Sequence, residues 1–432
     1  MKNLNINTKL YIGLAAMALV VSCKPEFDSW TAEKSATADF SKVIAVGNSL
    51  SAGYADGGLY LEGQQAAFPN LIADKMKGVG AGEFKSPWFP KAQENGSGYL
   101  RLKALVNGSP VTEFVTDKTA YTDAEKNHLL KNTDDIQNLG VPGIRVDHSQ
   151  VPLVSAANMF FERLLPDAEV GKKSYLDFVS NRNHTFFTCW IGGNDILGFA
   201  TNGGVLKLDG TATLTTLPVF QKMYADLVNR LTEKGQKGIL GTIPDVTSIP
   251  HFTTVTRQAL LAAVNAKVPT AVTDIYINTK AGVRPATDQD MFVLPFLSEG
   301  LLGVPNSEGR PYGLDPRNAV EDRFVLDTEE AKLVQQRTDE FNTFIKSTAE
   351  SKGLALADMS AFLHKVKFGY NYNGIPISAK FISGNAFSLD GIHLTPLGNA
   401  ITANVFIEAI NAKYGSRIEK VDASKYRGVK LP

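Results

Sequence analysis

The sequence has little cysteine, no excess of either charge and no apolar run long enough to cross a membrane. Two cysteines in 432 residues exclude a disulfide-stabilised fold and a four-cysteine zinc module. Lys plus Arg and Asp plus Glu both number 44, so no nucleic-acid partner is expected, because nucleic-acid binders usually carry a basic excess. The absence of an apolar run of about 20 residues argues against a transmembrane helix. The fold must therefore be held by a hydrophobic core.

The first residues have the features of an export signal. Lys2 and Lys9 precede a twelve-residue apolar run, Leu10 to Val21, and Ser22 and Cys23 follow it. A basic start, a short apolar core and a small residue before the cleavage point are typical of a signal peptide. The four residues that end in Cys23 resemble the lipobox of bacterial lipoproteins, a family in which the peptide is cut before the Cys and the Cys receives a lipid anchor.

This resemblance predicts a lipoprotein signal peptide over residues 1–22, lipidation of Cys23 and a tether over residues 23–40. An ordinary signal peptide with an incidental Cys is the alternative. Cleavage would remove two of the 44 basic residues and none of the 44 acidic ones, leaving 42 against 44, a net charge of −2. The expected location is the outer membrane or cell surface, with the chain held to the membrane by its N-terminal lipid. The remaining Cys189 lies in an apolar run and is expected to be a packed thiol.

Four apolar runs predict strands that are buried on both faces, as in a parallel sheet. Helical patterns lie between them, and the last opens with Asp327 and Glu330 at the spacing of a capping box. Another helix is expected to begin at Thr395 and Pro396. Strands that alternate with helices predict an α/β domain with a mainly parallel sheet, whose active site lies at the carboxyl ends of the strands. The strands are predicted at residues 43–46, 185–191, 238–243 and 354–357, and the helices at 68–77, 217–234 and 328–352.

Two stretches interrupt this alternation, at about residues 78–133 and 246–325. No Pro- or Ser-rich linker separates them from the rest, so both are predicted to be insertions in one domain over residues 41–414, with 415–432 as a C-terminal tail. Residues 291–297 are strongly apolar and could form either a lid over a pocket or ordinary core.

Ser49 follows the first predicted strand directly, within the run Gly-Asn-Ser-Leu of residues 47–50. A Ser at a strand-to-helix turn presents its hydroxyl at the carboxyl edge of the sheet, and its backbone N–H can face an anion there. The alternative is that Ser49 only caps the following helix.

Asp390 and His393 are three residues apart. A tight turn can bring the carboxylate to one ring nitrogen of the His and leave the other nitrogen free to take a proton from a Ser hydroxyl. A surface turn with a solvated Asp and His is the alternative.

Donors for an oxyanion follow another predicted strand. Asn194, in the run Gly-Gly-Asn-Asp, offers a side-chain amide of the kind that stabilises a tetrahedral oxyanion, although Asn is also common in turns. Residues 138–143, Asn-Leu-Gly-Val-Pro-Gly, offer a backbone N–H with no side chain in the way.

Taken together, these four segments resemble the SGNH, or GDSL-type, hydrolase family in the order in which they occur. The resemblance spans about residues 41–412. It implies a flavodoxin-like three-layer α/β/α fold and a triad of Ser49, His393 and Asp390. It further implies an oxyanion hole made by the N–H groups of Ser49 and Gly143 and the amide of Asn194, although Gly140 lies close to the Gly143 position. Asn48 replaces the Asp that usually precedes the nucleophile.

The resemblance implies an ester hydrolase that needs no metal or cofactor. The substrate is expected to be a small-molecule, lipid or glycan ester, because the long gaps between the blocks prevent a closer assignment. A carbohydrate O-deacetylase of the same family and a non-catalytic glycan- or lipid-binding lipoprotein are the alternatives. The chain has no Gly-x-Ser-x-Gly elbow and no His-Glu-x-x-His zinc motif, which disfavours the usual α/β-hydrolases and zinc proteases. The sequence does not indicate an oligomeric state.

Overall fold

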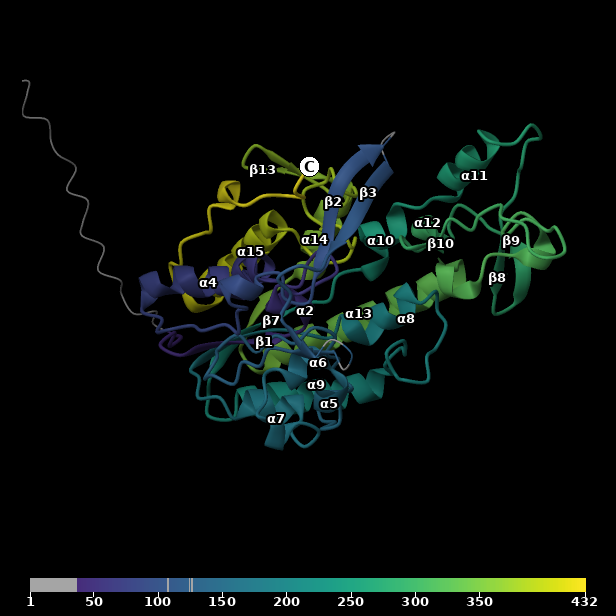
Figure 1. The fold of residues 1–432 in the computed structure, drawn as a ribbon. Coiled ribbons are helices and arrows are strands. Elements are labelled where there is room, and N and C mark those ends of the chain that lie inside the picture. Colours follow the sequence, from purple (N-terminus) through teal and green to yellow (C-terminus); the bar gives the residue numbers. More distant parts are fainter. Residues whose placement is uncertain (1–36, 107–108, 124, 126) are drawn as a thin grey trace, which may run out of the picture. The chain divides into compact units, whose positions relative to one another are not determined.

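The computed structural model describes residues 37–106, 109–123, 125 and 127–432 (Figure 1). The predicted signal peptide, Cys23 and the tether as far as residue 36 lie outside the described residues. The described chain clusters into one compact unit.

A parallel sheet occupies the centre of this unit. Within the described residues it has four strands in the order β1-β6-β7-β12. The four predicted strands are thus confirmed, each within two residues of its predicted ends. The strands are β1 (Val43–Gly47), β6 (Phe186–Trp190), β7 (Lys237–Gly241) and β12 (Ala355–Ala357).

A short extended segment continues the sheet on the free side of β1. The N–H of Ala45 donates to the carbonyl of Gln137 over 2.9 Å, and the N–H of Leu139 donates back to Ala45 over 2.8 Å. The N–H of Val141 then donates to Gly47 over 3.0 Å. With this segment beside β1, the order of the sheet is that of a flavodoxin-like fold.

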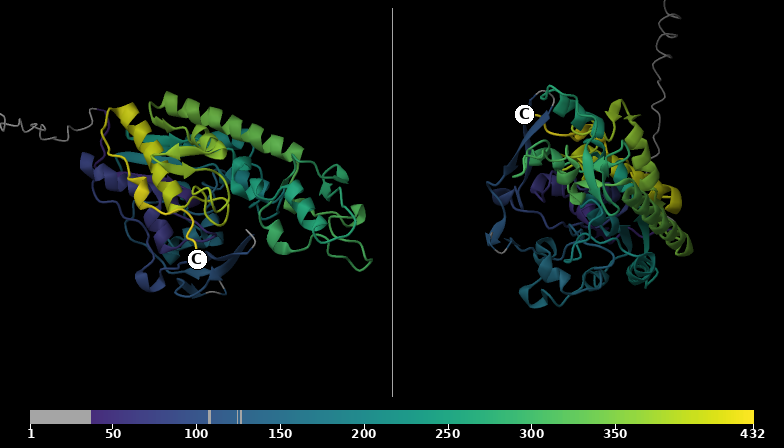
Figure 2. Two further views of the ribbon diagram at one scale, coloured as in Figure 1. Left: turned by 90° about the horizontal axis from the view of Figure 1, so that it is seen from above. Right: turned by 90° about the vertical axis from the view of Figure 1, so that its right-hand side faces the viewer.

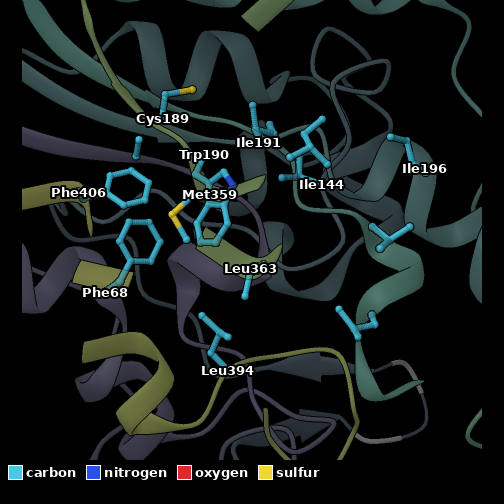
Figure 3. Packing of buried hydrophobic residues seen from close by; sticks show 14 of the residues in the cluster. Phe68, Ile144, Cys189, Trp190, Ile191, Ile196, Met359, Leu363, Leu394 and Phe406 are labelled. Carbon is cyan, nitrogen blue, oxygen red and sulfur yellow. The ribbon is translucent and has the colours of Figure 1, made fainter. Parts of the chain in front are cut away.

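The side chains of the sheet alternate between two helical layers. Trp190 of β6 packs edge-on against Phe68, with the ring centroids 5.4 Å apart, and also contacts Phe406 at 5.8 Å (Figure 3). Phe68 begins α4 (Phe68–Met76), and Phe406 belongs to α15 (Pro396–Tyr414). The preceding Cys189 is fully buried, and burial raises the pKa of its thiol to about 12. This confirms that Cys189 is a packed thiol.

The opposite layer contains α7 (Tyr175–Ser180), α9 (Leu217–Leu231) and α13 (Thr328–Ser351) (Figures 1 and 2). Phe220 of α9 and Phe341 of α13 stack with centroids 3.7 Å apart. The three-layer α/β/α architecture is therefore as predicted, with both faces of the sheet covered.

The predicted helix ends follow from their caps. The carboxylate of Asp327 accepts the N–H groups of Glu329 and Glu330, and Glu330 accepts the N–H of Asp327 over 3.0 Å. The capping box of α13 is thus present. Helix α9 ends at Leu231, three residues before its predicted end, with Thr232 as its C-cap and the Thr232 hydroxyl donating to the carbonyl of Val228 over 2.8 Å.

The stretch at 78–133 contains two hairpins in its described residues, β2 (Tyr99–Val106) with β3 (Ser109–Val115) and β4 (Tyr121–Asp123) with β5 (His128–Leu129). Two of its aromatic side chains pack against side chains from other parts of the domain. Phe89 is buried, with the guanidinium of Arg163 4.3 Å from its ring centroid, and Tyr99 stacks on Tyr60 at 4.2 Å.

The buried apolar residues of the 246–325 stretch belong to the main core of the domain. Phe292, Val293 and Phe296 of the run at 291–297 are among them, whereas Leu297 is exposed, so most of this run is core and not a lid. Its elements are α10 (Pro250–Thr253), α11 (Arg257–Asn265), β8 (Tyr276–Thr279), β9 (Gly282–Pro285), β10 (Met291–Phe292), α12 (Phe296–Glu299) and β11 (Val325–Leu326).

The remaining short elements connect these layers. They are α2 (Ser49–Ala52), α3 (Leu61–Ala66), α5 (Val154–Ala157), α6 (Met159–Glu162), α8 (Asn194–Thr201), α14 (Met359–Phe368), β13 (Tyr370–Tyr372) and β14 (Ile375–Ile377). Among the described residues, none of these or the longer helices combines the length and hydropathy needed to cross a bilayer.

The C-terminal residues 415–432 pack along the first helical layer. Arg427 makes a two-pronged ion pair with Glu62 of α3, at 2.7 and 2.8 Å, and its carbonyl accepts the N–H of Leu397 at the start of α15. Val421 is buried and donates its N–H to Asn404 over 2.7 Å.

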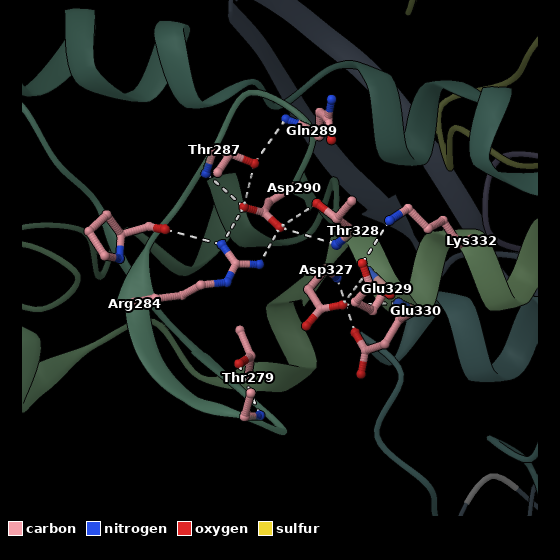
Figure 4. A network of polar contacts seen from close by, with 12 residues as sticks. Thr279, Arg284, Thr287, Gln289, Asp290, Asp327, Thr328, Glu329, Glu330 and Lys332 are labelled. Carbon is pink, nitrogen blue, oxygen red and sulfur yellow. Dashed lines mark hydrogen bonds and ion pairs between the residues drawn. The ribbon is translucent and has the colours of Figure 1, made fainter.

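A buried carboxylate ties the 246–325 insertion to the start of α13 (Figure 4). The side chain of Asp290 is fully buried and receives both terminal nitrogens of Arg284 at 2.7 Å. It also accepts the N–H groups of Thr287 at 2.7 Å and Thr328 at 3.2 Å. Burial alone would raise the pKa of Asp290, but these hydrogen bonds lower it to about 2.

We predict that Asp290→Ala lowers the free energy of unfolding by about 3–5 kcal/mol, because it leaves Arg284 and two backbone donors without their acceptor. The measurement is urea unfolding at pH 7. Because the folded pKa of Asp290 is depressed, the wild-type contribution is complete above about pH 4, the unfolded value. It is lost as the pH falls toward about 2.

Asp288→Ala is the matched control. Asp288 lies in the same turn, is exposed, and faces Arg257 at 3.4 Å, so its loss should cost about 1 kcal/mol or less. Equal effects of the two substitutions would contradict the structural role given to Asp290.

Candidate active site

Ser49 is the first residue of α2, directly beyond the carboxyl end of β1. The helix is capped by Asn48, whose side-chain oxygen accepts the N–H of Leu50 over 3.1 Å. The alternative that Ser49 serves as the cap is therefore wrong. Gly47 allows the close turn, because a side chain there would collide with Ser51 and with the carbonyl of Trp190.

The hydroxyl of Ser49 lies 2.8 Å from Nε2 of His393, and Nδ1 of His393 lies 2.8 Å from Oδ2 of Asp390. Both side chains of the Asp390–His393 pair are largely buried, at 12% exposure each. The structure thus brings Ser49 next to Asp390 and His393, which lie more than 340 positions later in the sequence. Because both side chains of the pair are largely buried, the alternative of a solvated surface turn at 390–393 is wrong.

Asp390 is held as an anion by its surroundings. Its Oδ1 accepts the N–H groups of Ile392 and His393, both at 2.8 Å, and the hydroxyl of Ser388 at 3.1 Å. Although burial acts to raise the pKa of Asp390, His393 and these hydrogen bonds hold it well below the ordinary value.

The turn after α2 fixes the position of this loop, a feature that the sequence did not indicate. The N–H of Gly57 donates to Oδ2 of Asp390 over 2.9 Å. Asp56 donates its N–H to the hydroxyl of Ser388 and accepts the N–H of Leu389, both at 2.9 Å. The buried Asp56 carboxylate also accepts the hydroxyl of Tyr60 at 2.7 Å, and burial raises the pKa of Asp56.

Tyr54 lies against the imidazole of His393. The two ring centroids are 4.7 Å apart with an interplanar angle of 51°, and the Tyr54 hydroxyl donates to the carbonyl of Gly57 over 2.7 Å. Tyr54 therefore restricts the orientation of the His393 ring.

Asn194, the first residue of α8, lies beyond the carboxyl end of β6 and lines the same cavity as Ser49 and His393. Its side-chain amide donates one hydrogen to the carbonyl of Ile144 over 2.9 Å, which fixes its orientation and leaves the second hydrogen available.

The two glycines of the 138–143 segment have different environments. The N–H of Gly140 donates to the side chain of Asn138 over 3.1 Å, and a side chain at Gly140 would meet the backbone of Ala52 at 2.5 Å. Gly140 is therefore a packing position. Gly143 is exposed with φ +80°, and the carbonyl before it is fixed by Asn158 over 2.8 Å. Among the described residues, none accepts a hydrogen bond from the N–H of Gly143 or Ser49.

A buried polar network supports these donors from behind. Asp195, next to Asn194, accepts the N–H groups of Val146 and Asp147 at 2.8 and 3.1 Å. Arg145 is buried and pairs with both oxygens of Asp147 at 2.8 Å. Burial, with the nearby Asp147, raises the pKa of Asp195. The network joins the segment that contains Gly143 to the start of α8.

An apolar cavity of about 60 Å³ opens beside Ser49. Val246 and Ile249, at the start of the 246–325 insertion, form part of its wall, so this insertion does shape the site. The lining also contains Asn48, Ser49, Leu50, Trp190, Gly193, Asn194, Leu197, Pro244, Leu363, Phe387, Ile392, His393 and Leu394.

The other histidines lie outside this triad. His251 is buried in α10, and burial lowers the pKa of its imidazole to about 4. Its backbone N–H donates to the carbonyl of Gly391 over 3.0 Å. His184 is buried between the carbonyls of Arg182 and Leu231. In the part of the chain that the structure describes, no cluster of His, Cys, Asp or Glu is arranged to hold a metal ion.

We predict that Asp56→Ala destabilises the protein by about 2–4 kcal/mol, since the buried donors of Leu389 and Tyr60 lose their acceptor. Asp56→Asn retains an acceptor for Leu389 and should cost less than half as much. Thermal unfolding and amide hydrogen exchange of residues 388–393 measure these effects. The exposed Asp74→Ala on α4 serves as the control, and unchanged exchange in Asp56→Ala would refute the proposed anchoring.

Comparison with known proteins identifies the family. The family model described as GDSL-like Lipase/Acylhydrolase matches residues 43–406. No curated protein matches the chain. Among solved structures, the lipase/acylhydrolase from Enterococcus faecalis is similar at 12% identity and a TM-score of 0.33, over 88% of this chain and 98% of that one. Since the family model covers most of the 432 residues, from β1 to α15, the chain belongs to the GDSL-like lipase/acylhydrolase family, whose members hydrolyse esters.

Proposed function

We propose that the protein is a serine esterase that uses Ser49 as nucleophile, His393 as general base and Asp390 as the orienting acid. The observation that carries this proposal is the continuous contact from Asp390 through His393 to Ser49, with both links at 2.8 Å. The nucleophile and base are within hydrogen-bonding distance, and the base is oriented by a third group, as nucleophilic catalysis requires.

In the first step, Ser49 Oγ forms a bond to the ester carbonyl carbon while its proton passes to Nε2 of His393. The anionic Asp390 stabilises the resulting imidazolium. The tetrahedral intermediate then collapses, the carbon–oxygen bond to the alcohol breaks, and His393 returns the proton to the leaving oxygen. In the second step, water attacks the acyl-Ser49 ester and gives a proton to His393; the bond from the acyl carbon to Ser49 Oγ then breaks, His393 returns the proton to Oγ, and the carboxylic acid is released.

The carbonyl oxygen becomes negative in both tetrahedral intermediates. We propose that the N–H groups of Ser49 and Gly143 and the free amide hydrogen of Asn194 stabilise this oxygen. The Asn194 amide is held in place by Ile144 and by the Asp195 network, so little reorganisation is needed when the charge develops.

We predict that Ser49→Ala lowers kcat for p-nitrophenyl butyrate by at least about 10⁴-fold, because the covalent intermediate cannot form. Asn194→Ala should lower kcat by about 100- to 1,000-fold, which is typical for loss of one oxyanion donor. Ester hydrolysis by the purified full-length protein is the measurement.

Ser51→Ala is the matched control, since Ser51 lies in the same short helix and its hydroxyl makes no hydrogen bond with the described residues. It should keep wild-type activity. A fluorophosphonate probe should label the wild type and the control but not Ser49→Ala. Full activity of Ser49→Ala would overturn the triad, and a wild type that neither reacts with the probe nor cleaves esters would favour a binding protein.

We further propose that the protein is exported and anchored to a membrane by a lipid on Cys23. The sequence of residues 1–23 supports this proposal: a basic start, a short apolar run, and a Ser directly before the Cys.

We expect that expression in a bacterium supplied with radiolabelled palmitate labels the wild type, and that Cys23→Ser abolishes both the label and recovery in the membrane fraction. Cys189→Ala is the control, and it should remain labelled because Cys189 is enclosed in the core. Labelling that survives Cys23→Ser would contradict the proposal.

A further inference from the structure

The apolar cavity beside Ser49 has features of a binding site for one part of the ester. We infer that it holds the acyl group, and that Val246, Ile249 and Leu363 limit this group to a short chain. This inference rests on the proposed function and names its substrate class.

The chemistry of the wall favours an alkyl chain. Apart from the reacting groups and Asn48, the described residues that line the cavity are apolar or glycine. A sugar ring placed here would leave its hydroxyls without partners, at a substantial desolvation cost. A methylene group would instead be transferred from water to an apolar surface, which favours binding about fourfold per group.

The position of the cavity favours the acyl group over the alcohol. The cavity begins at Ser49, and Asn194 in its wall is the proposed partner of the carbonyl oxygen. The alcohol must leave after the first step, whereas the acyl group stays bonded to Ser49 until water attacks. A pocket whose wall includes side chains that are less than 10% exposed, Val246, Ile249 and Leu363, suits the group that stays.

The size of the cavity sets the expected chain length. A volume of about 60 Å³ accommodates roughly four to six water-sized groups. The corresponding acyl groups are butyryl to hexanoyl, and longer chains would exceed this volume.

The part of the wall that contains Val246 is firmly attached to the fold. Val246 begins the short 3-10 helix η4 (Val246–Ser248), whose first turn is capped by Asp245 through the N–H of Thr247 at 3.0 Å. Just before it, Asn342 of α13 bonds both the N–H and the carbonyl of Ile243 at 2.7 Å. Since α13 spans one layer of the domain, the wall cannot yield easily to a longer chain.

The test measures kcat/KM of the full-length protein for p-nitrophenyl acetate, butyrate, hexanoate, octanoate and decanoate. For the wild type, kcat/KM should rise from acetate to a maximum at butyrate or hexanoate and should fall at least 10-fold from this maximum to decanoate. Val246→Trp reduces the volume of the cavity, so the ratio of kcat/KM for hexanoate to that for acetate should fall at least 30-fold. Ile249→Ala enlarges the cavity, so the maximum should move to longer chains.

Val283→Trp is the matched control, because Val283 is exposed on β9 and its substitution should leave the chain-length profile unchanged. Thermal unfolding checks that each variant is folded. If Val246→Trp does not fold, Ile249→Ala still tests the inference. A second series of acetate esters with alcohols of increasing size separates the two halves of the substrate. The dependence on alcohol size should be the same in wild type and variants.

Several outcomes would overturn the inference. If both cavity variants keep the wild-type acyl profile, or change the dependence on alcohol size instead, the cavity does not hold the acyl chain. In either case Ser49-dependent hydrolysis would persist and the proposed function would stand. If wild type cleaves no ester of any length, the proposed function itself fails, which is a different result.

Discussion

The carboxylate of Asp390 is the point at which two distant parts of the chain are joined. Its oxygens accept N–H groups from its own loop and from Gly57, 333 positions away. Two further bonds through Asp56 hold the same pair of segments together. Because His393 takes its position from Asp390, the geometry at Ser49 depends on this junction. A loop held by backbone donors from both sides is pre-organised, and hydrogen bonds to an anion are stronger than neutral ones.

The sheet makes this junction possible. Strands β1 and β6 are adjacent and parallel, so the residues that follow them, Ser49 and Asn194, emerge at the same edge. Helix α15 packs against α4 on one face and begins only three residues after His393. The hydrophobic core thus places three segments at one end of the sheet, and polar contacts complete the alignment there.

The parts of this structure that could be predicted from the sequence are those with a local signal. Buried parallel strands are continuous apolar runs, so β1, β6, β7 and β12 were found within two residues. Asp327 and Glu330 at capping-box spacing located the start of α13. Ser49, Asp390 and His393 were found because each belongs to a short motif that follows or precedes such an element.

The rest depends on contacts between distant segments. Asp56 and Tyr54 stand in a stretch that reads as an ordinary turn, and only the fold brings them to the loop of Asp390 and to His393. Asp195 is a single charged residue that accepts the N–H of Val146, 49 positions away, and no periodic pattern signals this contact. The apolar run at 291–297 was compatible with a lid and with core, because hydrophobicity alone does not distinguish a segment that covers a pocket from one that packs in the core.

The contact between α10 and the loop of residues 388–393 places Gly391 at a boundary between two parts of the domain. Gly391 has φ +71°, and a side chain there would meet Leu294 at 2.9 Å and the backbone of His251 at 3.0 Å, both from the 246–325 insertion. His251 in turn accepts the N–H of Leu294 over 2.8 Å. An insertion exchanged for that of a relative would therefore have to reproduce this small backbone surface. A change in the insertion that alters the pocket would therefore also act on the loop that carries Asp390 and His393.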